Sequence, residues 1–323
     1  MARVAWVESP LQMINALEYA QATGEALHIC LRAGVPKLGD TGRGLVPHLP
    51  KRVTMSGPWD SAMRSPFATA KRRLVGDVCS GQVRAVLTYT GVRDLVMVDD
   101  GSAMLSTARR LDRGVALARH GKPESLPMRA LGASTTSRLV NAMRRQRLAL
   151  FTAYASAPEV AALAAKGLRV QANDYVWLRS ADFEFGTSHD EHVVVGSALA
   201  DDGYVRPEAY MDWLRALTAE GPVAYFPHRR ETPASLTMWA AIPGVELRRT
   251  GLPIEVVIAA ATHVKRVSTL PSSVVATLPS VLADDVEFAV TPVPEAWLTP
   301  LADQPLRDVL DTVVTRRASI AAV

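Results

Sequence analysis

The amino-acid sequence has little of several features that mark common protein classes. Among 323 residues there are only two cysteines, Cys30 and Cys79, which is too few for a disulfide framework and favours a reducing compartment. Aromatic residues make up 6%, a low share for a protein that stacks on single-stranded nucleic acid. No apolar run approaches the roughly 18 residues of a membrane span, and the first residues lack the apolar length of a signal peptide. We therefore expect a cytoplasmic protein.

Several catalytic and cofactor motifs are also missing from the sequence. There is no P-loop, no dinucleotide fingerprint after the first apolar segment, and no zinc spacing of cysteine and histidine. The Gly-x-Ser-x-Gly elbow of many hydrolases and the Asp-x-Asp metal motif are absent as well. We therefore predict neither a metal nor a bound cofactor.

The composition instead suits a globular protein with two cores. Hydrophobic residues make up 48% of the chain, and its length is enough for two domains of ordinary size. The formal net charge is +4 and the isoelectric point is near 9.2, which agrees weakly with an anionic substrate or an anionic surface nearby.

The first half of the chain reads as alternating strands and helices. Ser9 and Pro10 predict the start of a helix that follows the first strand. We expect strands over 4–7, 26–31, 53–56, 85–89, 95–98, 148–152 and 168–171. We expect helices from residue 10 and over 66–78, 102–110 and 159–166, a loop over 34–50, and a helical or irregular stretch over 111–146.

The second half alternates more clearly. Strands are expected over 192–195, 223–226, 245–247, 264–268 and 286–290, with helices over 207–219, 233–241, 253–261, 273–277 and 306–322. The polar stretch 173–191 predicts a boundary between a domain over 1–180 and a domain over 181–300, with a C-terminal helix over 301–323 for which a return to the first domain stays open. Strands alternating with helices in both halves predict an α/β protein of two Rossmann-like, doubly wound parallel sheets.

The first candidate for chemistry is the acidic pair Asp99-Asp100, which follows the apolar run 96–98 and precedes Gly101 and Ser102. Ligands of open α/β sheets bind at the carboxyl ends of strands, so this pair is placed for general base catalysis. The alternative is an ordinary Asp-Gly turn that caps a helix. The triplet Asp201-Asp202-Gly203 repeats the pattern, but it lies in a polar loop and we discount it.

Two further strand ends in the second half bear polar groups. His228 follows the strand over 223–226 and is followed by Arg229 and Arg230, a combination suited to phosphate. Ser272 and Ser273 follow a strand and open a helix, where hydroxyl and backbone N–H groups form an anion site. The alternatives are a basic surface turn and a plain helix cap.

In this order, these pieces resemble the bacterial sialyltransferases and polysialyltransferases, which have a D/E-D/E-G motif, an HP-type motif and a paired-serine motif. The matching stretches are Asp99-Asp100-Gly101, 227–231 and Ser272-Ser273. The opening 8–12, with Asn15 and Glu18, also resembles the family's first strand-to-helix turn, and 195–197 resembles the start of its second domain. One departure is Arg229, where the family usually has proline.

The resemblance implies a GT-B fold with its cleft between the two domains, and an inverting, metal-independent transfer of a sialic or related nonulosonic acid from a CMP-activated donor to a glycan, glycolipid or other hydroxyl acceptor. It implies Asp99 as general base, with Asp100 as the other possible base, and His228 as general acid at the phosphate. The residues implied for the donor are Ser272, Ser273, Glu255, Arg229, Gly196 and Ser197. Those implied for the acceptor side are Ser9, Gln12, Gly101 and Ser102.

Other interpretations stay open. The protein could be another GT-B enzyme that uses a UDP-sugar, an epimerase included, or a non-catalytic binding protein of that fold. The basic patches 71–73, 109–110 and 144–147 read as solvated helix faces, or as a means of peripheral association with the inner face of the cell membrane. We expect no nucleic-acid partner, and the sequence does not indicate an oligomeric state.

Overall fold

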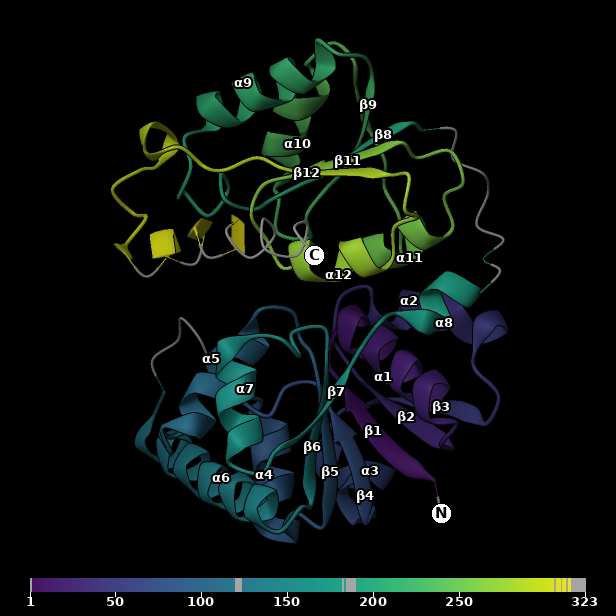
Figure 1. Ribbon diagram of the computed structural model, residues 1–323, viewed down its shortest axis with the longest axis vertical. Helices are drawn as coiled ribbons and strands as arrows, with labels where there is room; N and C mark the ends of the chain where they lie inside the picture. The colour runs from purple at the N-terminus through teal and green to yellow at the C-terminus, as the bar shows by residue number, and fades with distance from the viewer. Residues whose placement is uncertain are drawn as a thin grey trace. The chain divides into compact units, whose positions relative to one another are not determined.

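The computed structural model describes residues 2–119, 124–181, 183, 190–304, 306–308, 310–311 and 313–314 (Figure 1). Contacts divide the chain into two compact units, Met1–Asp182 and Phe183–Val323. Within the described residues, no helix is both long enough and apolar enough to cross a membrane.

The first unit is built on a seven-stranded sheet of order β3-β2-β1-β4-β5-β6-β7, and every pairing in it is parallel. Its strands are β1 (Arg3–Val7), β2 (Leu27–Arg32), β3 (Val53–Trp59), β4 (Arg72–Val75), β5 (Asp94–Val98), β6 (Leu148–Thr152) and β7 (Arg169–Ala172). Its helices are α1 (Pro10–Thr23), α2 (Leu38–Leu45), α3 (Pro66–Thr69), α4 (Gly81–Thr90), α5 (Ala103–Asp112), α6 (Leu126–Arg144), α7 (Pro158–Ala165) and α8 (Val176–Ser180), with 3-10 turns η1 (Val46–His48) and η2 (Ala62–Arg64).

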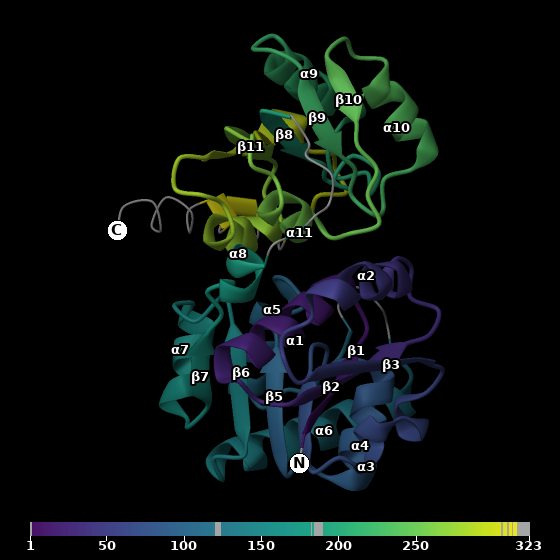
Figure 2. The ribbon, with the colours of Figure 1, turned by 90° about the vertical axis from the view of Figure 1, so that its right-hand side faces the viewer.

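The central strands of this unit form its core. Trp6, Leu74, Met97 and Val98 have no exposed surface, as expected for parallel strands that are covered on both faces. Helix α1 packs on α2 and α8, while α4 packs on α6 and α5 on α7 (Figure 2). The sheet is thus sandwiched between helices, and its strand ends are left to form the loops that bind ligands.

The second unit repeats the design with a five-stranded parallel sheet of order β10-β9-β8-β11-β12. Its strands are β8 (His192–Val195), β9 (Val223–Phe226), β10 (Val245–Leu247), β11 (Arg266–Thr269) and β12 (Glu287–Val290). Its helices are α9 (Pro207–Thr218), α10 (Pro233–Ala240), α11 (Ile254–Ala259) and α12 (Val274–Thr277), with 3-10 turns η3 (Leu278–Ser280) and η4 (Glu295–Trp297). Tyr210, Trp213 and Trp239 fill the core under α9 and α10.

Both sheets reverse their strand order beside their first strand. In the first unit the reversal lies between β1 and β4, and in the second it lies between β8 and β11. Such switch points open a crevice at the carboxyl ends of the two strands, where α/β proteins bind ligands. The expectation of two Rossmann-like, doubly wound parallel sheets is confirmed.

Three predicted elements of the first unit are wrong. The expected helix over 66–78 ends at Thr69, and strand β4 follows. The expected strand over 85–89 lies inside helix α4, because Val83, Val86 and Leu87 are buried at helical spacing. The expected loop over 34–50 contains α2 and η1. The closing helix is present at the described positions 306–308, 310–311 and 313–314, whereas 315–322 lie outside the described residues.

Candidate functional site

The acidic pair of the first unit follows β5, a central strand, as the sequence predicts. The Asp99 side chain is 1% exposed, and its Oδ2 accepts a hydrogen bond of 2.7 Å from the Ala153 N–H. Its Oδ1 is buried and has no hydrogen-bond partner among the residues that the structure describes. Burial raises the pKa of Asp99 to about 7, and the neighbouring charge of Asp100 adds to the rise. Asp99 therefore takes up and releases a proton near neutral pH.

The backbone of Asp99 is fixed by two asparagines. Asn15 on α1 donates from Nδ2 to the Asp99 carbonyl at 3.0 Å, and Asn173 donates to Asn15 Oδ1 at 3.0 Å. Glu18, one turn further along α1, accepts the backbone N–H groups of Trp177 and Leu178 at the start of α8. The sequence gives no sign of this role for Asn173, because only the folded chain brings the residue after β7 close to α1.

Asp100 is half-buried and therefore more accessible than Asp99. Ser9 Oγ donates to Asp100 Oδ1 at 2.9 Å and accepts the Gln12 N–H, so the predicted cap of α1 also orients an acid on another strand. Gly101 has a φ of 64°, a left-handed conformation that glycine adopts without strain. Ser102 stands at the start of α5 as predicted, but its side chain makes no capping hydrogen bond.

Gln12 does not lie where the acceptor-side interpretation needs it. It is 1% exposed, and its Oε1 accepts the Glu8 N–H at 2.8 Å inside the turn between β1 and α1. Its side chain fills the place that a Cβ on Gly76 would need, with Gln12 Cγ at 2.2 Å from that point. Gln12 therefore joins the ends of β1 and β4 and is not available to an acceptor.

A cavity of about 450 Å³ opens beside this edge of the first unit, between Arg32, Ser80, Arg119 and Ser125. Glu8 contacts three of the residues that line it: its Oε2 lies 3.2 Å from Arg32 Nη1 and 3.6 Å from Arg119 Nη2, and its Oε1 accepts from Ser80 Oγ. Arg119 Nη2 also lies 3.9 Å from Asp77 Oδ2. Burial, with a smaller contribution from the charge of Asp100, raises the pKa of Asp77 to about 6.

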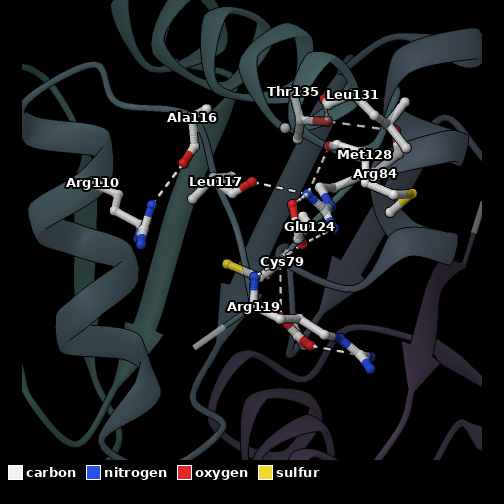
Figure 3. A network of polar contacts seen from close by, with 12 residues as sticks. Cys79, Arg84, Arg110, Ala116, Leu117, Arg119, Glu124, Met128, Leu131 and Thr135 are labelled. Atoms are coloured by element: carbon white, nitrogen blue, oxygen red, sulfur yellow. Dashed lines mark hydrogen bonds and ion pairs between the residues drawn. The ribbon is translucent and has the colours of Figure 1, made fainter. Parts of the chain in front are cut away.

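A buried arginine holds segments that line this cavity, and Figure 3 shows its polar contacts. Arg84 on α4 is 1% exposed and donates to the carbonyls of Leu117 and Met128, and its guanidinium pairs with Glu124 at 2.7 Å. A buried positive charge is stable only when it is paired and hydrogen-bonded. Through these contacts, Arg84 joins α4 to Leu117 and to the start of α6. Sequence reasoning missed Arg84, Glu124 and the cavity.

In the second unit, the predicted polar loops follow three neighbouring strands. Gly196 and Ser197 follow β8, His228 follows β9 and Ser272 follows β11. The carboxyl ends of parallel strands share one edge, and β8 and β11 flank the switch point. The structure thus brings the glycine, histidine and serine loops to one edge of this sheet.

A buried hydrogen-bond network joins two of these loops. Glu231 accepts from the Trp239 indole at 3.0 Å and from Tyr225 Oη through Oε1, and it accepts the His228 N–H through Oε2. Tyr225 Oη lies 2.8 Å from Tyr210 Oη, which accepts the Ser197 N–H at 3.0 Å. Burial raises the pKa of Glu231 to about 7.

The network leaves no room for a side chain at Gly196. A Cβ there would stand 2.5 Å from Glu231 Oε2 and 2.6 Å from Tyr225 Oη. The imidazole of His228 in turn accepts the Arg230 N–H through Nδ1 at 3.3 Å. Glu231 was visible in the sequence beside His228, but its two tyrosines and Trp239 read as ordinary core residues.

The paired serines open a helix too short to act as predicted. Helix α12 spans only Val274–Thr277, so its dipole adds little to an anion site. Ser272 Oγ is buried without a hydrogen-bond partner among the described residues, and Ser273 makes no side-chain cap. Glu255 is 5% exposed and accepts from Thr277 Oγ1 at 3.1 Å, and burial raises its pKa. Glu255 therefore links α11 to α12.

The other charged residues near these loops are either exposed or paired within the second unit. Arg229 is exposed, whereas Arg230 pairs with Asp202 at 2.8 Å. Asp201 accepts from Thr232 N and Ser235 Oγ at the start of α10, so the second Asp-Asp-Gly triplet serves the fold.

The arginines of two of the three predicted basic patches are paired inside the first unit. Arg73 is 5% exposed and donates to the carbonyls of residues 67, 68 and 91, while Arg72 pairs with Glu25 and Asp94. Arg109 pairs with Glu159 at 2.7 Å. The interpretation of 71–73 as a helix face is wrong, because Arg72 and Arg73 begin β4 and Lys71 directly precedes it. Residues 144, 145 and 147 are exposed at the end of α6.

Comparison with solved structures identifies the architecture. Over 98% of this chain and 97% of the other, the structure is similar to the α/β-galactoside α-2,3-sialyltransferase of the luminous marine bacterium Photobacterium phosphoreum, with a TM-score of 0.56 and 12% identity. The fold is that of the GT-B glycosyltransferases. Weaker GT-B likenesses include the E. coli heptosyltransferase WaaC with ADP (TM-score 0.44, 14% identity, 98% of each chain) and a UDP-glucose: anthocyanidin 3-O-glucosyltransferase with UDP (TM-score 0.46, 12% identity, 98% of this chain and 94% of that one). No protein-family profile and no curated protein sequence matches the chain.

Proposed function

We propose that this protein is a cytoplasmic, inverting, metal-independent glycosyltransferase that moves a sialic acid, or a related nonulosonic acid, from its CMP-activated donor to a hydroxyl acceptor. The observation that carries the proposal is the state of Asp99. It is a buried carboxyl at the end of a central strand, with a pKa near 7 and one oxygen that no described residue occupies. The GT-B fold and the three family motifs support the same activity.

In this proposal the first unit activates the acceptor. Asp99 Oδ1 takes the proton of the acceptor hydroxyl as the oxygen attacks the anomeric carbon, a contribution of about 10²–10⁴-fold to the rate. A base with a pKa near the working pH is suited to this task, because it is ionised and still basic. Asp100 is the alternative base on the ground of its exposure, and Ser9 holds its carboxylate in place.

The second unit binds and activates the donor in this proposal. His228 meets the departing phosphate as general acid, and its loop is positioned by the hydrogen bond from its N–H to Glu231. Ser272 Oγ has no partner of its own and donates to the phosphate, which gains charge as the bond to the sugar breaks. Arg229 adds a cation to the same anion. The roles first assigned to Glu255 and Gln12 are not part of the proposal, because both side chains are buried in contacts of their own.

The cavity beside Arg32 and Arg119 is proposed as the acceptor subsite. Two of the arginines that line it are paired with acids, Arg32 with Glu8 and Arg84 with Glu124, so its net charge is small. The guanidinium groups can donate hydrogen bonds to the hydroxyl groups of a sugar. We expect Arg119→Gln to raise the KM for the acceptor severalfold and to leave the KM for the donor unchanged. Arg113→Gln, an exposed arginine on the same segment, is the matched control and should change neither KM.

The donor is tested first by binding. Thermal-shift titrations with CMP, UDP and GDP should show stabilisation by CMP alone. In a separate activity assay, CMP should be released from CMP-sialic acid when a galactoside acceptor is added. Proton NMR of the product should show the inverted anomeric configuration. Stabilisation by UDP in place of CMP would point to a UDP-sugar enzyme. Binding of no nucleotide would favour a non-catalytic protein of this fold.

A further inference from the structure

A second, smaller cavity in the first unit is lined by three arginines. It has a volume of about 170 Å³ and lies among Arg138, Asn141, Arg145 and Arg147, with the backbone of Gly91 and Val92 on its other side. This volume is below the usual range of pockets that hold a nucleotide-sized ligand. The cavity can therefore accommodate one small group.

The local backbone explains why three arginines meet at this place. Arg138 and Arg145 lie seven residues apart, on one face of α6 and its C-terminal cap. Gln146 then takes a left-handed conformation with a φ of 57°, and the chain turns into β6. The Arg147 carbonyl accepts the Leu95 N–H at 2.9 Å, which anchors that residue beside β5.

Gly91 supplies the opposite wall of the cavity. It ends α4 with a φ of 76°, and a Cβ built on it would lie 3.9 Å from Arg138 Nη1. Helix α4 packs against α6 (Figure 1). This packing brings Gly91, at the end of α4, close to the arginines of α6.

Among the described residues, none is an acidic partner of the three guanidinium groups. Within the described part of the chain, none of them makes a side-chain hydrogen bond or ion pair, and no acidic residue lines the cavity. The nearest acid along the chain, Asp94, is already paired with Arg3 and Arg72.

Cations near a helix C-terminus are common, because the helix dipole favours them. The ends of α4 and α6 together supply the equivalent of about one negative charge, roughly half from each helix. Three full positive charges exceed that amount. The excess is what an anion would neutralise, and arginines are the side chains best suited to grip the oxygens of a phosphate group.

We infer that this cavity is a binding site for a single phosphate group, held by Arg138, Arg145 and Arg147. It lies before β5 and β6, whereas Asp99 follows β5, so the length of that five-residue strand, about 17 Å, separates the two sites. The site is thus independent of the proposed transfer reaction. The phosphate could come from a soluble phosphate compound or from the headgroup of an anionic lipid.

The test is calorimetric titration of the full-length protein with inorganic phosphate, with chloride added to keep the ionic strength constant. Arg145→Gln should weaken phosphate binding by about ten- to a hundredfold, because it removes a charge-assisted hydrogen bond. Arg144→Gln is the matched control, since it removes the same charge one residue away without lining the cavity, and it should change the affinity less than twofold. Circular dichroism melts should show that both variants stay folded.

A second arm separates the sources of the phosphate. Flotation with vesicles of phosphatidylcholine, with and without phosphatidic acid, is measured for the same three proteins. Binding only to vesicles that contain phosphatidic acid, lost in Arg145→Gln and kept in Arg144→Gln, supports a lipid headgroup, while binding of free phosphate alone supports a soluble ligand. Equal losses in both variants would reduce the observation to diffuse surface charge and overturn the inference. So would the absence of binding in both arms.

Discussion

Two buried carboxyl groups, one in each unit, differ in a way that separates chemistry from support. Asp99 and Glu231 both belong to loops after strands, and burial raises the pKa of both to about 7. Glu231 has both oxygens filled by donors of its own unit, the Trp239 indole, Tyr225 and the His228 N–H. Asp99 has one oxygen filled and one without a partner among the described residues. A raised pKa alone therefore does not mark a base, and the unfilled oxygen is the informative feature.

The largest effect is expected when the open carboxyl is neutralised. Asp99→Asn keeps the shape and the hydrogen bond from Ala153, but removes the proton acceptor, so transfer from CMP-sialic acid should fall by about 10²–10⁴-fold. CMP affinity, measured by calorimetry, should stay within twofold. Asp202→Asn, in the second Asp-Asp-Gly triplet, is the matched control and should keep its activity. Retained activity in Asp99→Asn together with a large loss in Asp100→Asn would move the base to Asp100.

A change beside Glu231, whose two oxygens both accept hydrogen bonds, should lower the stability of the protein and disturb the position of the His228 loop. Gly196→Ala places a methyl group against Glu231 Oε2 and Tyr225 Oη, both closer than side-chain contacts allow, and it should destabilise the protein by about 1–3 kcal/mol. Because the network also holds the His228 N–H, the rate of transfer should fall more than the affinity for cytidine. Denaturant unfolding and steady-state kinetics measure the two effects. Unchanged stability would show that the network can expand and does not fix the histidine loop.

The pH dependence of stability sharpens the comparison. Asp99 ionises near pH 3.8 in the unfolded chain and at about 7 in the folded one, so the folded state holds the proton between those values and stability falls as pH rises through that window. Asp99→Asn removes this loss. Relative to the parent protein, it should gain stability between pH 4 and pH 8, by about 4 kcal/mol at most. Urea denaturation at the two pH values measures it, and an equal difference at both would show that burial does not raise the pKa.

The sequence predicted the parts of the fold in which apolar runs are uninterrupted. The strands at 95–98, 192–195 and 223–226 were found, since their residues are buried on both faces. Strand β4 was missed, because it begins with Arg72 and Arg73. The charge of Arg73 is satisfied by three backbone carbonyls that come from 67, 68 and 91, and no local pattern reveals such partners.

In the candidate site, too, the sequence predicted some residues and not others. The positions of Asp99, His228 and Ser272 after their strands followed from apolar runs and turn residues, and their catalytic roles remain proposals. The residues that hold them were not predictable. Asn173 reaches Asn15 from 158 positions away, and Tyr210 and Tyr225 present hydroxyls to a network although their spacing is that of core residues. Long-range polar partners leave no periodic signal, whereas burial does.

The smallest effect is expected at the hydroxyl of the second unit. Ser272 Oγ has no protein partner among the described residues, so Ser272→Ala costs the free protein little, and its consequence should appear only when phosphate is bound. We expect CMP to bind about fivefold to tenfold more weakly, in line with the loss of one hydrogen bond to a charged group, and cytidine to bind as before. Calorimetry with the two ligands measures the difference, and Ser235→Ala, whose hydroxyl is already committed to Asp201, is the control that should lower the melting temperature instead. An equal loss for CMP and cytidine would mean that Ser272 shapes the nucleoside pocket and makes no contact with phosphate.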